Sequence, residues 1–221
     1  MSQAAPTRTL GAILYPDFEL LDLFGPLEMF GTLGPEVRIV TVAEEPGPVR
    51  STPGPATVAD FAFADCPKLD LLLLPGGIGT LAQLGNEKLL TFLRERSQTA
   101  ELTLSVCSGS AILAKAGVLD GRRATSNKVY FDLARGQSDA VDWVEKARWV
   151  EDGPFVTSSG VSAGTDMALG VIERLFGRER AEAVALVTEY QWHSDASTDP
   201  FAAYLNQTQH AAAAVGASPP E

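Results

Sequence analysis

The amino-acid sequence predicts an α/β protein, a three-layer sandwich in which helices cover both faces of a mostly parallel central sheet. Short apolar runs alternate along the chain with segments whose apolar residues follow helical spacing. Residues 69–74 are apolar without interruption, which is typical of a strand buried on both faces of a parallel sheet. The length of 221 residues suits one domain. We therefore expect a single domain over residues 1–221, with frayed ends at 1–7 and 211–221.

The predicted strands are short apolar or β-branched runs bounded by turn residues. Pro16-Asp17 ends the first run, Pro75-Gly76-Gly77 ends the third, and Asp152-Gly153 precedes the last. The stretch 44–55 is rich in Pro and Gly and is expected to form a loop or hairpin. The runs are 9–15, 37–42, 69–74, 102–106, 141–150 and 155–158.

The predicted helices are segments in which apolar residues recur every three or four positions. In the first, Leu20, Leu23 and Leu27 share one side, and Gly25-Pro26 is expected to interrupt it. Gly177 separates the last two helices. The segments are 19–30, 81–97, 111–116, 128–134, 162–176 and 178–190.

Composition and charge exclude several classes of protein. The net charge of −11 and the absence of a Lys/Arg cluster argue against a nucleic-acid partner. No run reaches the roughly 18 apolar residues that a membrane span needs. Cys66 and Cys107 are the only cysteines, which argues against a disulfide framework and favours the reducing cytoplasm. No metal-ligand spacing and no dinucleotide fingerprint occur. We therefore expect no nucleic-acid or membrane partner and no metal or cofactor.

Cys107 stands where a predicted strand passes abruptly into a predicted helix. Ser108, Gly109 and Ser110 are small enough for a tight turn, which is the outline of a nucleophile elbow. A buried structural thiol is the commonest state of a free cysteine, but this placement favours a reactive one. Backbone N–H groups at a helix N-terminus stabilise an anion and can lower a thiol pKa below about 8.5. We expect a thiolate near neutral pH, whereas Cys66, with no helix after it, is interpreted as a packing residue.

Other groups are predicted to join Cys107, because sites in parallel sheets lie beyond the carboxyl ends of the strands. Asp22, flanked by leucines, is either a helix cap or a desolvated acid that can transfer protons, and Glu19 is a rival for that role. The glycines at 76–79 let backbone N–H groups point into a site, although turns also need glycine. His193 and His210 lie in an irregular C-terminal region. A Cys-His-Asp triad would need that region to fold back over the site.

Six segments together resemble the ThiJ/PfpI superfamily, whose flavodoxin-like fold is similar to that of class I glutamine amidotransferases. The resemblance runs from about residue 9 to residue 190, and the order and spacing of the segments agree. Within the superfamily it points to the isocyanide hydratases, because Asp22 sits in a Leu-Asp-Leu-x-Gly-Pro setting and 63–67 precedes the central strand. The segments are 11–17, 21–26, 74–77, 105–110, 116–125 and 159–166.

The resemblance implies a cofactor-free lyase that adds water to an isocyanide and yields an N-substituted formamide. It implies that Cys107 is the nucleophile and Asp22 the general acid and base. The N–H groups of Gly77 and Ser108 would stabilise developing charge, and Gly76, Ile78 and Asn127 would line the pocket. Superfamily members commonly form homodimers with the site near the interface, so a homodimer is expected.

Asn127 marks a departure from the pattern, because many relatives have a histidine at this position. Its presence argues against amidase or protease chemistry that needs a cysteine–histidine pair. Two alternatives to isocyanide hydration stay open. One is glyoxalase-like hydration of 2-oxoaldehydes, which the missing histidine disfavours. The other is a non-enzymatic redox sensor in which Cys107 is oxidised.

Overall fold

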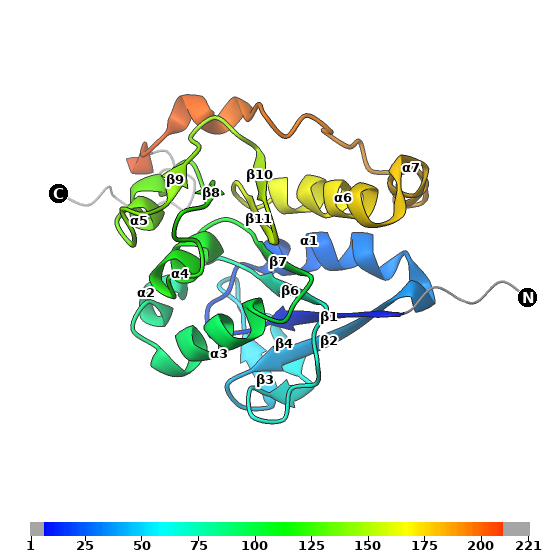
Figure 1. Cartoon of the computed structure of the whole chain (residues 1–221), viewed down its shortest axis with the longest axis horizontal. Coiled ribbons are helices and arrows are strands. Elements are labelled where there is room, and N and C mark those ends of the chain that lie inside the picture. Colours follow the sequence, from blue (N-terminus) through cyan, green and yellow to red (C-terminus); the bar gives the residue numbers. More distant parts are fainter. Residues whose placement is uncertain (1–6, 210–221) are drawn as a thin grey trace, which may run out of the picture.

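A seven-stranded sheet forms the centre of the molecule in the computed structural model, which describes residues 7–209 (Figure 1). The strand order is β10-β11-β7-β6-β1-β2-β5. Every neighbouring pair is parallel except β10 with β11, so the predicted mostly parallel sheet is confirmed. The strands are β1 (Arg8–Ile13), β2 (Val37–Ala43), β5 (Phe61–Ala62), β6 (Leu71–Leu74), β7 (Leu102–Ser105), β10 (Trp149–Asp152) and β11 (Phe155–Ser158).

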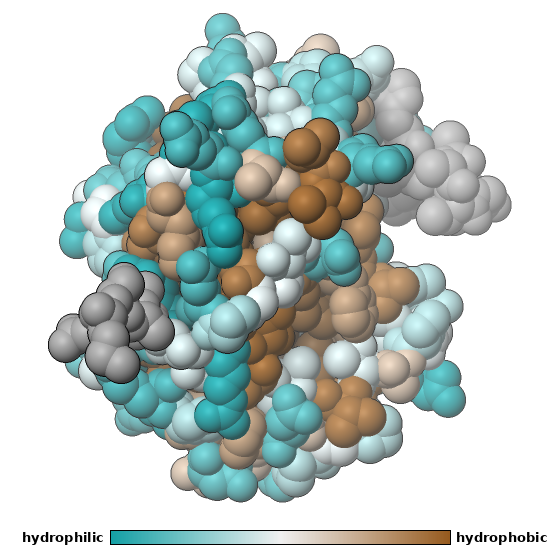
Figure 2. Space-filling view, turned by 90° about the vertical axis from the view of Figure 1, so that its right-hand side faces the viewer, coloured by the Kyte–Doolittle hydropathy of each residue, from teal (hydrophilic) through white to brown (hydrophobic). Residues whose placement is uncertain are grey.

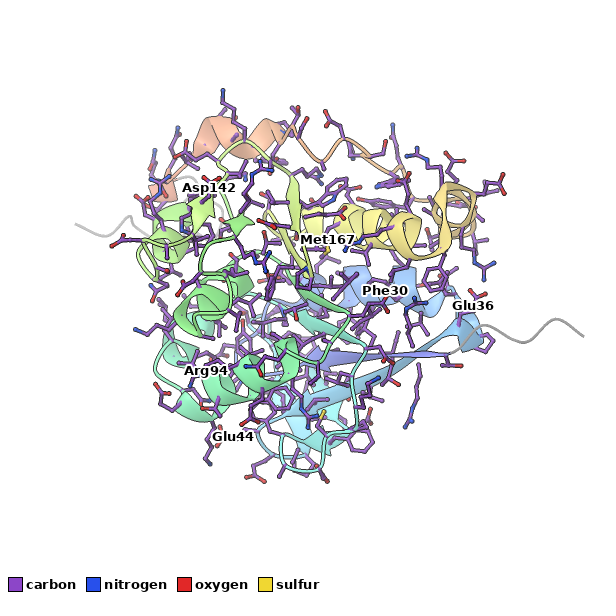
Figure 3. The ribbon with its side chains drawn as sticks, in the orientation of Figure 1. Phe30, Glu36, Glu44, Arg94, Asp142 and Met167 are labelled. Atoms are coloured by element: carbon purple, nitrogen blue, oxygen red, sulfur yellow. The ribbon has the colours of Figure 1, made fainter. Side chains whose placement is uncertain are left out.

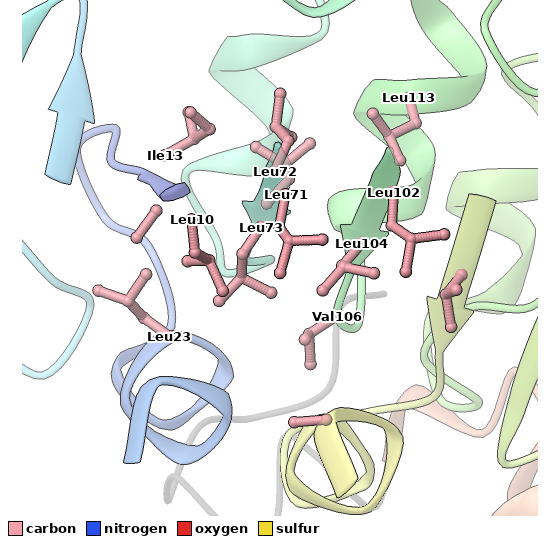
Figure 4. Close-up of a cluster of buried hydrophobic side chains, with 14 of the residues drawn as sticks. Leu10, Ile13, Leu23, Leu71, Leu72, Leu73, Leu102, Leu104, Val106 and Leu113 are labelled. Carbon is pink, nitrogen blue, oxygen red and sulfur yellow. The ribbon is translucent and has the colours of Figure 1, made fainter. Parts of the chain in front are cut away.

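Helices cover both faces of this sheet, which completes the predicted three layers (Figures 1 and 4). One face carries α1 (Leu20–Gly31) and α6 (Ala163–Phe176), with α7 (Arg178–Val187) beside α6. The other face carries α2 (Thr80–Gln83), α3 (Glu87–Ser97), α4 (Gly109–Lys115) and α5 (Phe131–Arg135). Two short 3₁₀ segments are η1 (Gly34–Glu36) and η2 (Pro200–Tyr204). No helix within residues 7–209 is long and apolar enough to cross a membrane.

The core lies on both faces of the central strands. All four residues of β6 are buried, as expected for a strand covered on both sides. Leu23 of α1 and Leu113 of α4 approach the sheet from opposite faces (Figure 4). Phe30 of α1 and Met167 of α6 are fully buried and lie in the layer between these helices and the sheet (Figure 3). This rigid sheet fixes where its carboxyl-end loops lie.

Two small sheets account for segments whose structure differs from the simple expectation. The stretch expected to be a loop or hairpin contains the antiparallel pair β3 (Gly47–Arg50) and β4 (Ala56–Ala59). The strand expected over 141–150 is divided. Its first part, β9 (Asp142–Trp143), pairs with β8 (Arg123–Ala124), and its last residues begin β10 of the central sheet. The residues between them bend, because the carbonyls of Val144 and Ala147 accept side-chain hydrogen bonds from the loop before α5.

Three helix expectations are corrected. The helix expected over 81–97 is two helices: α2 ends at Gln83, and Asn86 caps the start of α3 by accepting the N–H groups of Lys88 and Leu89. The helix expected over 128–134 begins only at Phe131, since the preceding residues form a loop. Gly25-Pro26 does not interrupt α1, which runs through Pro26.

Close contact with α6 explains why Gly25 and Pro26 are tolerated inside α1. A Cβ atom at Gly25 would lie 2.5 Å from Oγ1 of Thr165 on α6, so a side chain there would separate the helices. A Cβ atom at Gly164 would in turn lie 3.3 Å from Cγ of Pro26. This close packing holds α1 against α6, although Pro26 cannot donate a backbone hydrogen bond.

Candidate active site

The loops after β1, β6, β7 and β11 meet at one edge of the sheet, as expected for parallel strands. The Glu19 N–H donates to the carbonyl of Gly76 at 2.7 Å, which joins the first loop to the second. The Cys107 N–H lies 3.2 Å from the Ser158 carbonyl and 3.1 Å from that of Ser159, which joins the third loop to the fourth. The four segments therefore form one site around Cys107.

Cys107 occupies a left-handed backbone conformation between β7 and α4. Its φ is 57°, a region that residues with side chains rarely adopt. The hydroxyl groups of Ser110 and Ser126 both donate to the Cys107 carbonyl at 3.1 Å, and these bonds hold the strained residue in place. Gly109 is required next to it, because a Cβ atom there would lie 2.6 Å from the Leu74 carbonyl oxygen. Cys107 is buried in this turn, with 7% of the residue exposed.

Asp22 is fully buried in the first turn of α1, beside Cys107. The Gly76 N–H donates to Oδ2 at 2.8 Å, whereas Oδ1 has no hydrogen-bond partner within the described chain. Burial raises the pKa of Asp22 from 3.8 to about 7, against the lowering effect of the Gly76 N–H and the Cys107 thiol. The charge of Glu19 raises the pKa further. The carboxyl group is thus a desolvated acid and not a helix cap.

The thiol of Cys107 is protonated at neutral pH. Burial raises its pKa well above the ordinary value, and the nearby charge of Asp22 raises it further. Hydrogen bonds from the N–H groups of Ser108 and Val161 and from Asn127 lower the pKa, but by less. The expectation of a thiolate near neutral pH is therefore wrong. Burial of the sulfur and the neighbouring carboxylate outweigh the lowering effect of the N–H groups that face it.

Asn127 and Ser108 lie directly against the sulfur. Nδ2 of Asn127 donates to Sγ at 3.1 Å, and the Ser108 N–H also faces Sγ. The N–H of Gly77 instead donates to Oγ of Ser108 at 3.2 Å, so its expected role as an oxyanion donor stays a prediction. Gly76 closes the site between two predicted groups, since a Cβ atom there would lie 2.6 Å from the Ser108 nitrogen and 3.0 Å from Oδ2 of Asp22. Ile78 is 62% exposed at the rim, next to Gly77.

Val161 is a site residue that the sequence did not predict. Its N–H faces the sulfur, and its φ of 36° is strained for a β-branched residue. The loop that carries it follows β11 and precedes α6. The predicted strand over 155–158 pointed to this loop, because sites in parallel sheets lie beyond the carboxyl ends of strands, but a valine side chain does not signal a backbone contribution.

The remaining predicted residues lie apart from the thiol. His193 has a largely exposed side chain, and its N–H donates to Oδ1 of Asp166 at 3.0 Å, away from Cys107. His210 lies outside the described residues. Cys66 is buried and its thiol donates to the Pro67 carbonyl at 3.4 Å, in keeping with a packing role. Over residues 7–209, no group of three or more His, Cys, Asp or Glu side chains is arranged to hold a metal ion.

The sequence and the fold match those of known proteins. The model of the DJ-1/PfpI family matches residues 11–174. The chain belongs to the DJ-1/PfpI family. This confirms the resemblance to the ThiJ/PfpI superfamily inferred from the sequence motifs, since the two names denote one family.

Individual relatives agree with this assignment. The chain is 37% identical over 183 residues to a protein named isonitrile hydratase from Pseudomonas putida, and the match covers 82% of this chain and 78% of the relative. A ThiJ/PfpI family protein from Pseudomonas syringae has a TM-score of 0.79 and 33% identity, covering 95% of this chain and 88% of that one. DJ-1beta from Drosophila melanogaster has a TM-score of 0.75 at 22% identity, covering 85% and 100%, and shows the shared fold.

Proposed function

We propose that this protein hydrates isocyanides to N-substituted formamides, with Cys107 as nucleophile, Asp22 as general acid and base, and no cofactor. The observation that carries the proposal is the buried pair of one thiol and one carboxyl group whose pKa is about 7. A carboxyl group with that pKa is partly protonated at neutral pH and can both take and give a proton. The similarity to the isonitrile hydratase from Pseudomonas putida supports the same reaction.

The first half of the reaction forms a covalent intermediate. The sulfur attacks the terminal carbon of the isocyanide while its proton passes to Asp22 and from there to that carbon. One S–C bond and one C–H bond form, the S–H bond breaks, and the product is a thioimidate. Because Asp22 removes the proton as the sulfur attacks, the reaction does not require a thiolate in the resting protein.

The second half consumes one water molecule. Asp22 takes a proton from the water as its oxygen adds to the thioimidate carbon, and the nitrogen receives that proton. The C–S bond then breaks, the carbonyl forms, and the hydroxyl proton returns to the sulfur through Asp22. The N-substituted formamide leaves and the thiol is restored. Oδ1 of Asp22, which lacks a partner within the described chain, supplies the lone pairs for this water.

The rim of the site favours a substrate with an apolar substituent on nitrogen. Ile78 and Tyr130 are 62% and 48% exposed. Ile78 follows Gly77, and the Tyr130 N–H donates to Oδ1 of Asn127, whose amide contacts the sulfur. An aryl or branched alkyl group can bury part of this surface when the isocyanide carbon reaches Cys107.

The test is turnover of cyclohexyl and 4-nitrophenyl isocyanide, with formamide followed by absorbance and mass spectrometry in isotope-labelled water. We expect one labelled oxygen in each formamide. Cys107→Ala should abolish turnover, and Asp22→Asn should lower kcat by about 100- to 10,000-fold. No turnover by the unmodified protein, or undiminished turnover by Cys107→Ala, would show the proposal to be wrong. Conversion of methylglyoxal to lactate in place of isocyanide turnover would favour the glyoxalase-like alternative, and selective peroxide oxidation of Cys107 without any turnover would favour the sensor.

We also propose a cytoplasmic homodimer. Both cysteines are free, which suits a reducing compartment. On its outer side α1 exposes Leu21 and Phe24, which line a hollow of about 460 Å³ between α1 and the β3–β4 hairpin. A second apolar patch lies on the molecular edge that includes α7 (Figure 2). We assign the α1 surface to the dimer because the same helix carries Asp22. Light scattering should give twice the monomer mass, and Phe24→Asp should return it to one.

A further inference from the structure

The loop between β8 and α5 fixes the orientation of the Asn127 side chain. Oδ1 accepts the N–H of Tyr130 at 3.1 Å, and Nδ2 lies 3.1 Å from Sγ of Cys107. Because a backbone N–H can only donate, the amide oxygen must face Tyr130, and the amino group must face the sulfur. The contact is therefore a hydrogen bond donated to sulfur by a neutral group.

Several contacts keep this amide in place. A Cβ atom at Gly160 would lie 2.5 Å from Nδ2, so the absence of a side chain there gives the amide its room. The next residue, Lys128, is buried and donates through Nζ to Oγ1 of Thr125 at 2.8 Å and to the Ala147 carbonyl at 2.7 Å. The Asn206 N–H donates to the Lys128 carbonyl at 2.8 Å. The loop is thus held on both sides of the residue that contacts the thiol.

The other groups that face the sulfur cannot stabilise a negative charge on it as a cation would. Asp22 from α1 is itself an acid, and its pKa is raised chiefly by burial and further by the charge of Glu19. Tyr15, two residues after β1, is buried, and its hydroxyl donates to the Pro75 carbonyl at 2.8 Å and not to the sulfur. The backbone N–H groups of Ser108 and Val161 are neutral donors. Asn127 supplies the side-chain donor in this set.

We propose that Asn127 is a catalytic residue whose amide stabilises the negative charge on the Cys107 sulfur while the thiol proton moves to Asp22, and again when the sulfur leaves the tetrahedral intermediate. An amide neither takes nor gives a proton under these conditions, so every proton transferred in the reaction passes through Asp22. The catalytic part of this inference rests on the proposed function. The stabilisation of the sulfur anion does not, because it follows from the contact itself.

Alkylation of Cys107 by iodoacetamide tests the inference without a substrate. The rate constant at pH 8, read by mass spectrometry at the Cys107 peptide, follows the fraction of thiolate. A hydrogen bond to a charged group changes such an equilibrium by about 10- to 100-fold. We expect that loss in Asn127→Ala and a larger one in Asn127→Asp, which places an acceptor and a charge against the sulfur. Gly160→Ala should also slow alkylation, because it displaces the amide without changing its chemistry.

Asn206→Asp is the matched control, because it makes the same exchange of amide for acid on a residue whose N–H contacts the loop at Lys128 and whose side chain accepts from Asp132 of α5. Its alkylation rate should equal that of the unmodified protein. The inference is overturned if Asn127→Ala and Asn127→Asp are alkylated as fast as the unmodified protein while their circular dichroism and Tm are unchanged. Should either variant unfold, Gly160→Ala decides the matter in the same way.

Turnover separates this inference from the proposed function. In the unmodified protein, the pH dependence of kcat should show one ionisation, that of Asp22, and Asn127→His should add a second. If isocyanides are not hydrated but the Asn127 variants lose alkylation, the proposed function is wrong and stabilisation of the sulfur anion stands. If isocyanides are hydrated and Asn127→Ala retains full kcat with the same pH profile, the catalytic role is wrong.

Discussion

Replacing Asp22 by asparagine should stabilise the protein at alkaline pH while it removes activity. The carboxyl group is fully buried, and its pKa is raised from 3.8 to about 7, chiefly by burial. An acid whose pKa is higher in the folded than in the unfolded state favours folding at low pH. It opposes folding increasingly as the pH rises between the two values. In the Asp22→Asn variant the amide oxygen can still accept the Gly76 N–H, so the change removes the buried charge and keeps this contact.

The magnitude follows from the size of the pKa shift. One pKa unit corresponds to about 1.4 kcal/mol, so the rise at Asp22 costs about 4 kcal/mol once the group is fully ionised. About 1.7 kcal/mol of this cost is already present at pH 5, because the Asp22 carboxyl group is ionised in the unfolded chain and protonated in the folded one at that pH. The free energy of unfolding of Asp22→Asn, relative to that of the unmodified protein, should therefore increase by about 2.5 kcal/mol from pH 5 to pH 8.

Urea unfolding at pH 5, 6, 7 and 8 under reducing conditions measures this difference. Asp139→Asn is the matched control, because it removes one negative charge from an exposed site. The free energy of unfolding of the control, relative to the unmodified protein, should not change with pH over this range. If the relative stability of Asp22→Asn is also constant between pH 5 and pH 8, the carboxyl group has an ordinary pKa. The reaction sequence built on it would then lose its acid and base.

Further predictions concern residues that shape the site or hold the fold. Arg148 donates through Nε to the buried Asp166 carboxylate at 2.6 Å. Arg148→Ala leaves that carboxylate buried without a cation and should lower the free energy of unfolding, measured in urea, by about 3–5 kcal/mol. The double change Arg148→Met with Asp166→Leu should cost less, because the Asp166 charge is removed with its partner, while the buried Asp199, 3.7 Å from Arg148, still loses that cation. Gly76→Ala should lower isocyanide turnover by about 100-fold, since its Cβ atom would displace Ser108 and Asp22. Gly85→Ala, which meets no close atom, should have no effect on turnover.

The sequence predicted the elements whose signal is local. The apolar run that became β6 and the Gly-rich loop after it marked the centre of the sheet, because burial on both faces leaves an unmistakable pattern. The continuity of α1 through Pro26 could not be predicted in this way. It depends on Gly25 and Gly164, which let two helices approach that are far apart in the sequence. A local rule about proline does not include that contact.

The sequence allowed two side chains of the site to be predicted, but not the ionisation state of its thiol. The position of Cys107 between a strand and a helix, together with the motif around Asp22, indicated both groups from the sequence alone. Val161 contributes only its N–H, and a backbone group carries no signature in the residue type. The ionisation state of the thiol depends on how many atoms surround it, which the fold decides. Residue types along the chain contain no measure of this burial, and the thiolate expectation failed for that reason.

A site with a protonated thiol beside a partly protonated acid should differ in its reactivity from a site with a resting thiolate. A stored thiolate reacts with any electrophile that reaches it, including peroxide, because the anion is always present. In the proposed mechanism the sulfur becomes anionic only while Asp22 accepts its proton, and the Asn127 amide stabilises that anion. An isocyanide suits such a pair because its terminal carbon needs both the sulfur and the proton that the sulfur loses. An electrophile that cannot accept the proton leaves Asp22 protonated, and its reaction with the sulfur is accelerated less. The ratio of isocyanide turnover to the rate of peroxide oxidation at Cys107 should therefore fall by about 100-fold or more in Asp22→Asn, because proton transfer to the substrate carbon is lost.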